Sequence, residues 1–200
     1  MRTRRGIAPR GVLASVRLAA QCHGVPVNSD VRRHDALRFC TVLYKLQSPQ
    51  NVGMIVRSHV AFGGDCVVLL GNEQPWRFGK GTQAFSRKLE KVCEFVHLPD
   101  EDEFFSWCDS RRYEPVALEI AAPPRYVHEV QFPERLALIA GAEGPGLPSA
   151  FLDRCKQVVT IPQFGGAESL NVAVACSIAM YEVRRGAKTP LNIEGSAYAV

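Results

Sequence analysis

The chain of 200 residues lacks any hydrophobic run long enough to cross a membrane. A membrane-spanning helix needs about 20 mainly apolar residues. The longest buried-looking runs, such as residues 66–70, have only the length of a strand. Hydrophobic residues make up 46% and charged residues 22% of the chain, which is ordinary for a soluble globular protein. We therefore expect one globular domain with some additional chain and no membrane partner.

The seven cysteines form no CxxC pair, and their number is odd. This pattern argues against a disulfide framework and against a zinc site. The five histidines likewise show no metal-ligand spacing. Most of the cysteines lie in apolar segments and are typical of reduced, buried thiols, which indicates a reducing compartment. We expect a cytoplasmic location, with organellar import as an alternative.

Positive charge is concentrated at the start of the chain. Residues 1–36 hold seven Arg and two Asp, whereas residues 37–200 hold 17 basic and 18 acidic side chains. A basic arm on a nearly neutral body is typical of a segment that binds nucleic acid phosphates. A solvated tail and an Arg-rich transit peptide are the alternatives. We divide the chain into a basic arm (1–36), a main domain (37–186) and a tail (187–200).

From residue 37 onward, strand-like and helix-like segments alternate. This alternation predicts an α/β fold, with a mostly parallel sheet flanked by helices. In such sheets ligands bind beyond the carboxyl ends of the strands. We expect strands at 37–46, 66–70, 92–98, 115–121, 136–140 and 157–161, and helices at 51–61, 84–90, 100–110, 148–155 and 169–185.

A glycine-rich loop at 141–146 directly follows a predicted buried strand. Its spacing is neither that of a dinucleotide-binding GxGxxG turn nor that of a phosphate-binding loop. Most such glycines merely form a turn. Glu143 in the middle of this turn and the stiffening Pro145 instead favour a site for a positive or donor-rich ligand.

Two other segments combine backbone-shaping residues with polar side chains. In residues 51–57, Asn51 is positioned to cap a helix, and Arg57 has apolar neighbours that place its head group at the edge of the core. Such an arginine needs an anion, which an RNA phosphate or Glu143 would supply. In residues 161–171, Ser169 fits a helix N-cap and Asn171 can bond nearby backbone. Each feature alone has a purely structural explanation.

Taken together, the three segments resemble the SpoU/TrmH branch of the SPOUT RNA methyltransferases. The matching motifs are Asn-x-Gly-x-x-x-Arg at 51–57, Gly-x-Glu-Gly-x-Gly at 141–146 and Ile-Pro-x-x-Gly-x-x-x-Ser-Leu-Asn at 161–171. They occur in the order of the family, and the resemblance covers roughly residues 37–186. Gln163 departs from the pattern, because many relatives carry an apolar residue there.

The resemblance implies a fold whose C-terminal segment forms a deep trefoil knot, a homodimer made through the knot and the last helix, and S-adenosylmethionine as cofactor. By motif position, cofactor-binding residues would be Gly141, Gly146, Ile161, Pro162 and Leu170. The polar residues of the catalytic site would be Asn51, Arg57, Glu143, Ser169 and Asn171. The small residues of helix 169–185 would pack at the dimer contact.

The family reaction transfers a methyl group to a ribose 2′-hydroxyl of RNA. The hydroxyl oxygen must lie roughly 3 Å from the methyl carbon and in line with the bond to sulfur. Because arginine resists deprotonation, we expect Arg57 to stay cationic, hold the phosphate beside the target ribose and lower the pKa of the hydroxyl. Asn51 would help to position that group, and Glu143 would fix the loop, through Arg57 in one version of this hypothesis.

The RNA itself is not specified by these motifs. Residues 1–36 are too short for the separate RNA-binding domain of some ribosomal RNA enzymes, which favours tRNA slightly over rRNA. Contacts to RNA would then come from the arm, the dimer surface and loop 77–83, with Arg77 and Lys80. Two alternatives stay open, namely an RNA-binding or assembly protein that keeps the fold without catalysis, and a base-methylating enzyme of the same fold.

Overall fold

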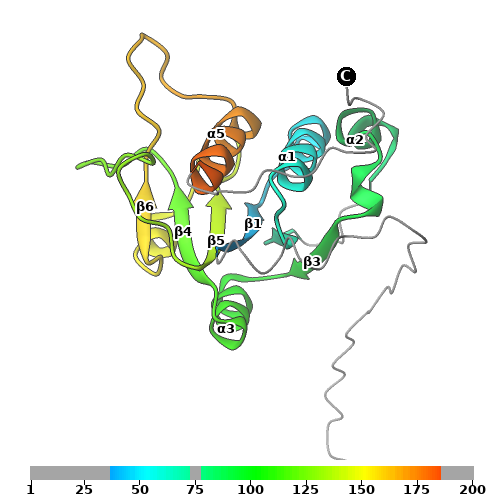
Figure 1. Ribbon diagram of the computed structural model, residues 1–200, viewed down its shortest axis with the longest axis horizontal. Helices are drawn as coiled ribbons and strands as arrows, with labels where there is room; N and C mark the ends of the chain where they lie inside the picture. Colours follow the sequence, from blue (N-terminus) through cyan, green and yellow to red (C-terminus); the bar gives the residue numbers. More distant parts are fainter. Residues whose placement is uncertain (1–36, 73–77, 186–200) are drawn as a thin grey trace, which may run out of the picture.

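The computed structural model describes residues 37–72 and 78–185, so the predicted arm, the tail, Trp76 and Arg77 lie outside the described residues. Six strands form one sheet in the order β3-β2-β1-β5-β4-β6, and every neighbouring pair is parallel. The predicted α/β class and parallel sheet are therefore confirmed (Figure 1). The strands are β1 (Arg38–Tyr44), β2 (Cys66–Leu70), β3 (Glu94–Leu98), β4 (Glu114–Leu118), β5 (Arg135–Ala140) and β6 (Gln157–Val159).

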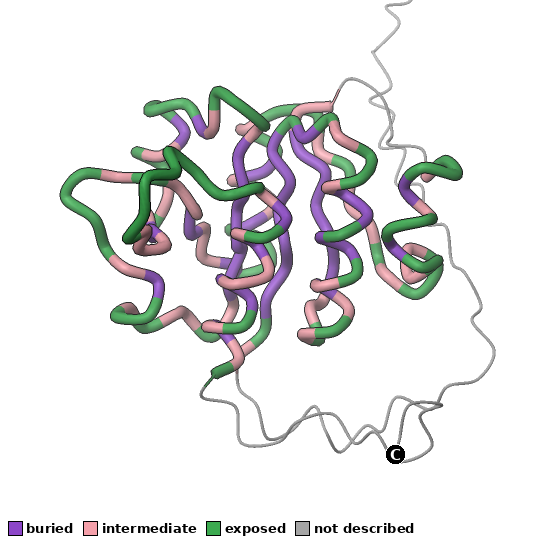
Figure 2. The backbone as a smooth tube through the Cα atoms, turned by 90° about the horizontal axis from the view of Figure 1, so that it is seen from above, coloured by how far each residue is buried: buried purple, intermediate pink, exposed green. Residues whose placement is uncertain are grey.

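Helices cover both faces of the sheet. The α-helices are α1 (Pro49–Ala61), α2 (Lys80–Ser86), α3 (Glu101–Arg111), α4 (Ser149–Leu152) and α5 (Val172–Arg184), with a 3-10 turn at Leu89–Lys91. Helices α1, α2 and α5 lie on one side of the sheet and α3 on the other (Figure 1). The central strands between the two layers are buried along their length (Figure 2).

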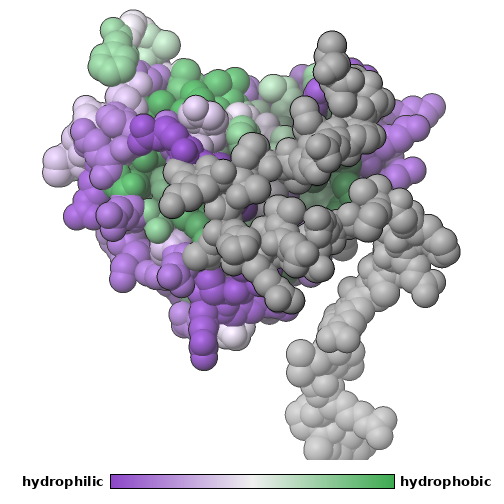
Figure 3. Space-filling model, viewed as in Figure 1, coloured by the Kyte–Doolittle hydropathy of each residue, from purple (hydrophilic) through white to green (hydrophobic). Residues whose placement is uncertain are grey.

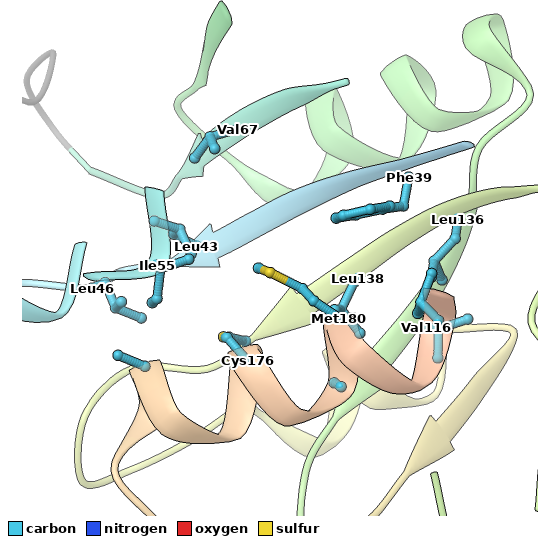
Figure 4. Packing of buried hydrophobic residues seen from close by; sticks show 14 of the residues in the cluster. Phe39, Leu43, Leu46, Ile55, Val67, Val116, Leu136, Leu138, Cys176 and Met180 are labelled. Carbon is cyan, nitrogen blue, oxygen red and sulfur yellow. The ribbon is translucent and has the colours of Figure 1, made fainter. Parts of the chain in front are cut away.

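The side chains of β1 alternate between two hydrophobic clusters, one on each face of the sheet. Phe39 and Leu43 join the cluster under α1 and α5, whereas Cys40 and Val42 join the cluster on the α3 side. This is the two-residue period of a strand covered on both faces. On the first face, Met180 of α5 packs toward the strands, close to residues of β1 and β5 (Figure 4).

The predicted starts of two helices are wrong, because in each case a different residue is the N-cap. Helix α1 begins at Pro49, and Ser48 is its N-cap, accepting a hydrogen bond from the Asn51 amide at 3.3 Å. Proline suits the first helical position because that position has no intrahelical partner for its N–H. Helix α5 begins only at Val172, because the side chain of Asn171, and not that of Ser169, accepts from the first helical amides.

The segment predicted as loop 77–83 followed by helix 84–90 is also divided differently. Its helix α2 spans Lys80–Ser86, and residues 89–91 form the separate 3-10 turn. The predicted helix at 148–155 is only Ser149–Leu152. The predicted helix 100–110 is confirmed to within one residue as α3, and Asp100 is its N-cap, accepting from the Glu103 amide at 2.9 Å.

Helix α1 ends at a glycine pair that fits around a buried histidine. His59 is 1% exposed, its Nδ1 lies 2.8 Å from the Thr41 hydroxyl, and burial lowers its pKa from 6.5 to about 4. A Cβ atom added at Gly64 would overlap the His59 ring. Glycine at this position thus permits the turn to close over the imidazole.

Within the described ranges, no helix is long and apolar enough to cross a membrane.

We predict that Gly64→Ala lowers the free energy of unfolding by about 2 kcal/mol, because the added methyl group overpacks the site. Gly81→Ala is the matched control, since nothing lies within 4 Å of its added Cβ. That change in an exposed helix should leave stability unchanged or raise it by about 0.5–1 kcal/mol. Urea unfolding followed by circular dichroism measures both, and equal stabilities of the two variants would contradict this account.

Candidate active site

A cavity of about 280 Å³ lies beyond the carboxyl ends of β4, β5 and β6, next to the start of α5. Eight of the ten predicted site residues line it, whereas Arg57 and Pro162 do not. Segments from four distant parts of the sequence thus meet at one edge of the sheet, as expected for parallel strands. The residues from the predicted set are Asn51, Gly141, Glu143, Gly146, Ile161, Ser169, Leu170 and Asn171.

The Glu143 carboxylate joins the β5 loop to the start of α1. It accepts hydrogen bonds from the Asn51 side chain at 2.9 Å and from the backbone amides of Gln47 and Ser48 at 3.1 and 3.3 Å. It does not bond Arg57, so the version of the hypothesis in which Glu143 acts through Arg57 is wrong. A carboxylate accepts several donors at once, which suits a loop that must hold a helix start.

Asn51 and Asn171 extend this connection to α5. The Asn171 side-chain amide donates to Asn51 Oδ1 at 3.1 Å, while Asn171 Oδ1 accepts from the amides of Ala173 and Val174 at 2.9 and 3.3 Å. Asn171 therefore uses one end of its amide to cap α5 and the other to hold Asn51. Glu143, Asn51 and Asn171 form one continuous network, which we call the loop clamp.

The pKa of Glu143 lies below its ordinary value. Partial burial raises it, but the hydrogen bonds from Asn51, Gln47 and Ser48 lower it by more. These donors favour the charged form, because they bond a carboxylate better than a carboxylic acid. Glu143 is therefore an anion at neutral pH, on the wall of the cavity.

The glycines of the loop are needed for its close folding. A Cβ atom at Gly141 would lie 2.7 Å from the carbonyl carbon of Gly146 and 2.8 Å from the Leu147 nitrogen. Gly146 has φ +68, the left-handed region that favours glycine. Both positions leave backbone, and not side chain, at the cavity surface.

Glu119 is a cavity residue that the sequence analysis missed. It follows β4, and its carboxylate accepts from the amides of Leu147 and Ile120, both at 3.0 Å. The signal was present, because an acidic residue at the carboxyl end of a parallel strand points to a ligand site. It was hidden because the predicted strand 115–121 ran past its true end at Leu118.

Ser169 and Arg57 occupy places that differ from the predicted ones. Ser169 is exposed on the cavity rim and, within the described residues, makes no side-chain hydrogen bond. Arg57 is exposed, and not at the edge of the core, on a separate cavity formed with α2 and the turn after it. The three predicted segments therefore converge, but Arg57 points to a different surface of α1 from Asn51.

The lining of the first cavity fits a ligand with positive charge and apolar parts. It holds two carboxylates, Glu119 and Glu143, and no lysine or arginine. Its apolar part comes from Leu118, Ile161 and other aliphatic residues, and Gln163 adds a buried Oε1 atom that has no hydrogen-bond partner among the described residues. No group of three or more His, Cys, Asp or Glu in the part of the chain that the structure describes is arranged to hold a metal ion.

Comparison with known proteins identifies the family. The model of the SpoU rRNA Methylase family matches residues 38–181, and the chain belongs to this family. A 23S rRNA (guanosine(2553)-2'-O)-methyltransferase, RlmP of Bacillus subtilis, is 35% identical over 70% of this chain and 55% of its own length. The SpoU methyltransferase AviRb of Streptomyces viridochromogenes, solved with AdoMet, superposes with TM-score 0.67 and 26% identity over 76% of this chain and 61% of its own.

A further solved structure concerns 2-OH methylation of C/U34 on tRNA. It matches with TM-score 0.63 and 25% identity, covering 75% of this chain and 96% of that protein. In contrast, this chain spans 55–63% of the length of the rRNA methyltransferases of Coxiella, Streptomyces and Bacillus that it resembles.

We predict that Glu143→Ala frees the start of α1. Loss of the carboxylate leaves the amides of Gln47 and Ser48 without acceptors, so their hydrogen exchange should accelerate by about tenfold. Glu129→Ala is the control, because Glu129 is exposed and pairs only with His128 in the described chain. Exchange measured residue by residue by NMR tests this, and unchanged protection of both amides would refute the loop clamp.

Proposed function

We propose that this protein transfers a methyl group from S-adenosylmethionine to a ribose 2′-hydroxyl of structured RNA. The observation that carries the proposal is the acidic cavity bordered by the loop clamp, in a chain of the SpoU family. The same residues would serve little purpose in a fold kept only for RNA binding, because carboxylates repel the phosphates of RNA. A base-methylating enzyme has no specific observation in its favour.

The cavity suits the cofactor by charge and by shape. S-adenosylmethionine supplies a methyl group on a positively charged sulfur. The carboxylates of Glu119 and Glu143 attract such a cation, while the backbone near Gly141, Gly146, Ile161 and Leu170 would hold the nucleoside. Because the sulfonium charge disappears in the transition state, carboxylates already engaged by backbone donors are better suited than free ones, which would over-stabilise the bound cation.

Arg57 would act on the RNA and not on the cofactor. It is absent from the cofactor cavity and lies on the same helix as Asn51. An arginine that stays cationic can grip a phosphate and lower the pKa of a nearby hydroxyl, but it is unsuited to removing the proton itself. Asn51 would help to place the ribose, and Ser169 and Asn171 would order the loop that enters α5.

The RNA class is proposed on two opposing observations. Three of the relatives with named substrates act on 23S rRNA. The solved tRNA-related protein instead has nearly the length that this chain matches, without a large additional part. We therefore propose structured RNA as the substrate class and keep the slight preference for tRNA as a prediction to be tested against rRNA.

A homodimer and a knotted C-terminal segment belong to the same proposal. Of the small residues of α5 expected at the dimer contact, Ala173 and Ala179 are buried within the chain, whereas Ala175 and Ser177 are half-buried. Apolar side chains are exposed on another face, with Val174 41% and Tyr181 55% accessible. Figure 3 shows hydrophobic surface on this side of the molecule. A second copy packed on this face of α5 would remove it from water.

We predict that the purified protein forms a 2′-O-methylated nucleoside in one class of RNA. Transcripts of tRNA and of 23S rRNA domains are incubated with S-adenosylmethionine and digested, and the nucleosides are identified by mass spectrometry. Arg57→Ala should lower turnover at least about a thousandfold and leave S-adenosylhomocysteine affinity, measured by calorimetry, nearly unchanged. Arg112→Ala, on the opposite layer of the fold, should retain activity.

Three results would count against this function. Absence of cofactor binding would favour the non-catalytic alternative. A methylated base in place of a ribose would favour the base-methylating one. Near-normal turnover by Arg57→Ala would leave the reaction in place and refute the role of Arg57.

We predict that Val174→Lys shifts the protein toward the monomer, because it places a charge in the exposed apolar face of α5. Light scattering should give twice the chain mass of 22.1 kDa for the wild type and a lower mass for the variant. Val92→Lys is the matched control, since Val92 is 62% exposed and far along the chain from α5. A wild-type monomer at all concentrations would refute the dimer.

A further inference from the structure

A second cavity, of about 600 Å³, lies between α1 and the end of α2 and carries three cations. Its lining residues are Arg57, Gln83, Ala84, Arg87, Lys88 and Leu89. All three cationic side chains are exposed, and within residues 37–72 and 78–185 none of them makes a hydrogen bond or an ion pair. We call this cavity the basic groove.

The packing of α2 on α1 explains why these cations meet. A Cβ atom at Gly53 would lie 2.6 Å from the Thr82 carbonyl oxygen and 2.9 Å from Phe85 Cβ, so glycine allows the two helices to touch through backbone. Arg57 is four residues after Gly53 and therefore lies on the same face of α1, one turn on. The close contact between α1 and α2 thus places Arg57 next to the end of α2.

The turn after α2 then presents two more charges. Arg87 and Lys88 both have left-handed backbone, with φ 57 and φ 65. Left-handed backbone is unfavourable for non-glycine residues, which adopt it mostly as single residues, so a consecutive pair is unusual. This backbone folds the chain back after α2, so that both side chains line the groove with Arg57.

Glu90, an acid close to the groove cations in the sequence, is not among the groove-lining residues. Glu90 accepts a hydrogen bond from the Ser86 hydroxyl, which is buried, and its Oε1 atom is also buried. The carboxylate is therefore directed inward and is not part of the groove lining. Three cations in one concave surface repel one another, and a ligand with several negative charges relieves this repulsion.

We propose that the basic groove binds the phosphodiester backbone of the RNA substrate beside the methylated nucleotide. This inference rests on the proposed function, and adds Arg87 and Lys88 as RNA-binding residues. Asn51 at the cofactor cavity and Arg57 at the groove are six residues apart on α1, a rise of about 9 Å along the helix. An RNA segment that passes around this part of α1 would contact both, with its ribose at the cavity and a neighbouring phosphate in the groove.

The test replaces two of the three groove cations, by Arg87→Gln/Lys88→Gln, and measures binding of a fluorescent tRNA transcript and of oligouridylate. We expect affinity for both to fall about tenfold, and the slope of log affinity against log salt to become shallower by about 1.5, because two phosphate contacts are lost. Affinity for S-adenosylhomocysteine and the unfolding temperature should not change.

The matched control is Arg111→Gln/Arg112→Gln. It removes two consecutive cations at the end of α3, where Arg112 has the same left-handed backbone with φ 59, on the opposite side of the sheet. It should leave the salt slope unchanged. Equal losses in both double variants would mean that only net charge matters, and an unchanged slope in the groove variant would overturn the inference while the proposed function stands. Failure of the wild type to bind either RNA would overturn the inference and the preference for tRNA, whereas the proposed function is tested separately by the methylation assay with tRNA and 23S rRNA transcripts.

Discussion

The hydrogen bonds to the Glu143 carboxylate determine whether this protein has a site at all. The sheet brings the strand ends to one edge, but loops at that edge are otherwise independent of one another. Glu143 ties the β5 loop to the start of α1, and the Asn51–Asn171 bond ties α1 to the start of α5. Because each member both donates and accepts, or accepts several times, loss of one frees the others, as in any cooperative polar network. The walls of the cofactor cavity are therefore defined relative to one another by three side chains.

Much of this could be predicted from the sequence, since a parallel sheet follows from alternating segments and places the loops after its strands at a common edge. The residues at which α1 and α5 begin could not be predicted from the sequence. Ser48 and Asn51 can both cap a helix, and Ser169 and Asn171 present the same choice. Ser48 caps α1 and Asn51 lines the cavity, while Asn171 caps α5 and Ser169 lies on the cavity rim. Tertiary contacts determine which residue is the cap, because Asn51 donates to Glu143 from within the first turn of α1.

The position of Arg57 shows a different limit of sequence reasoning. Asn51 and Arg57 belong to one short motif, yet six residues of α-helix rotate the second by about 240° from the first. They therefore face different surfaces, whereas Gly53 and Arg57 share one. The helical spacing of Asn51 and Arg57 can be read from the sequence and indicates different surfaces, whereas the family motif suggests a single pocket. What the sequence could not supply was the packing of α2, which depends on backbone contact at Gly53.

The two surfaces differ in charge in a way that suits two ligands of opposite sign. Carboxylates line the cofactor cavity, and cations line the basic groove. If the two sets were mixed, Arg57 would pair with Glu143, and neither a sulfonium nor a phosphate would find a free partner. Keeping them on different faces of α1 prevents this pairing while leaving both within reach of one nucleotide segment. In the proposed reaction, helix α1 would act as a rigid spacer between the methyl donor and the RNA, and its geometry would limit which RNA backbone can present a hydroxyl to the methyl group.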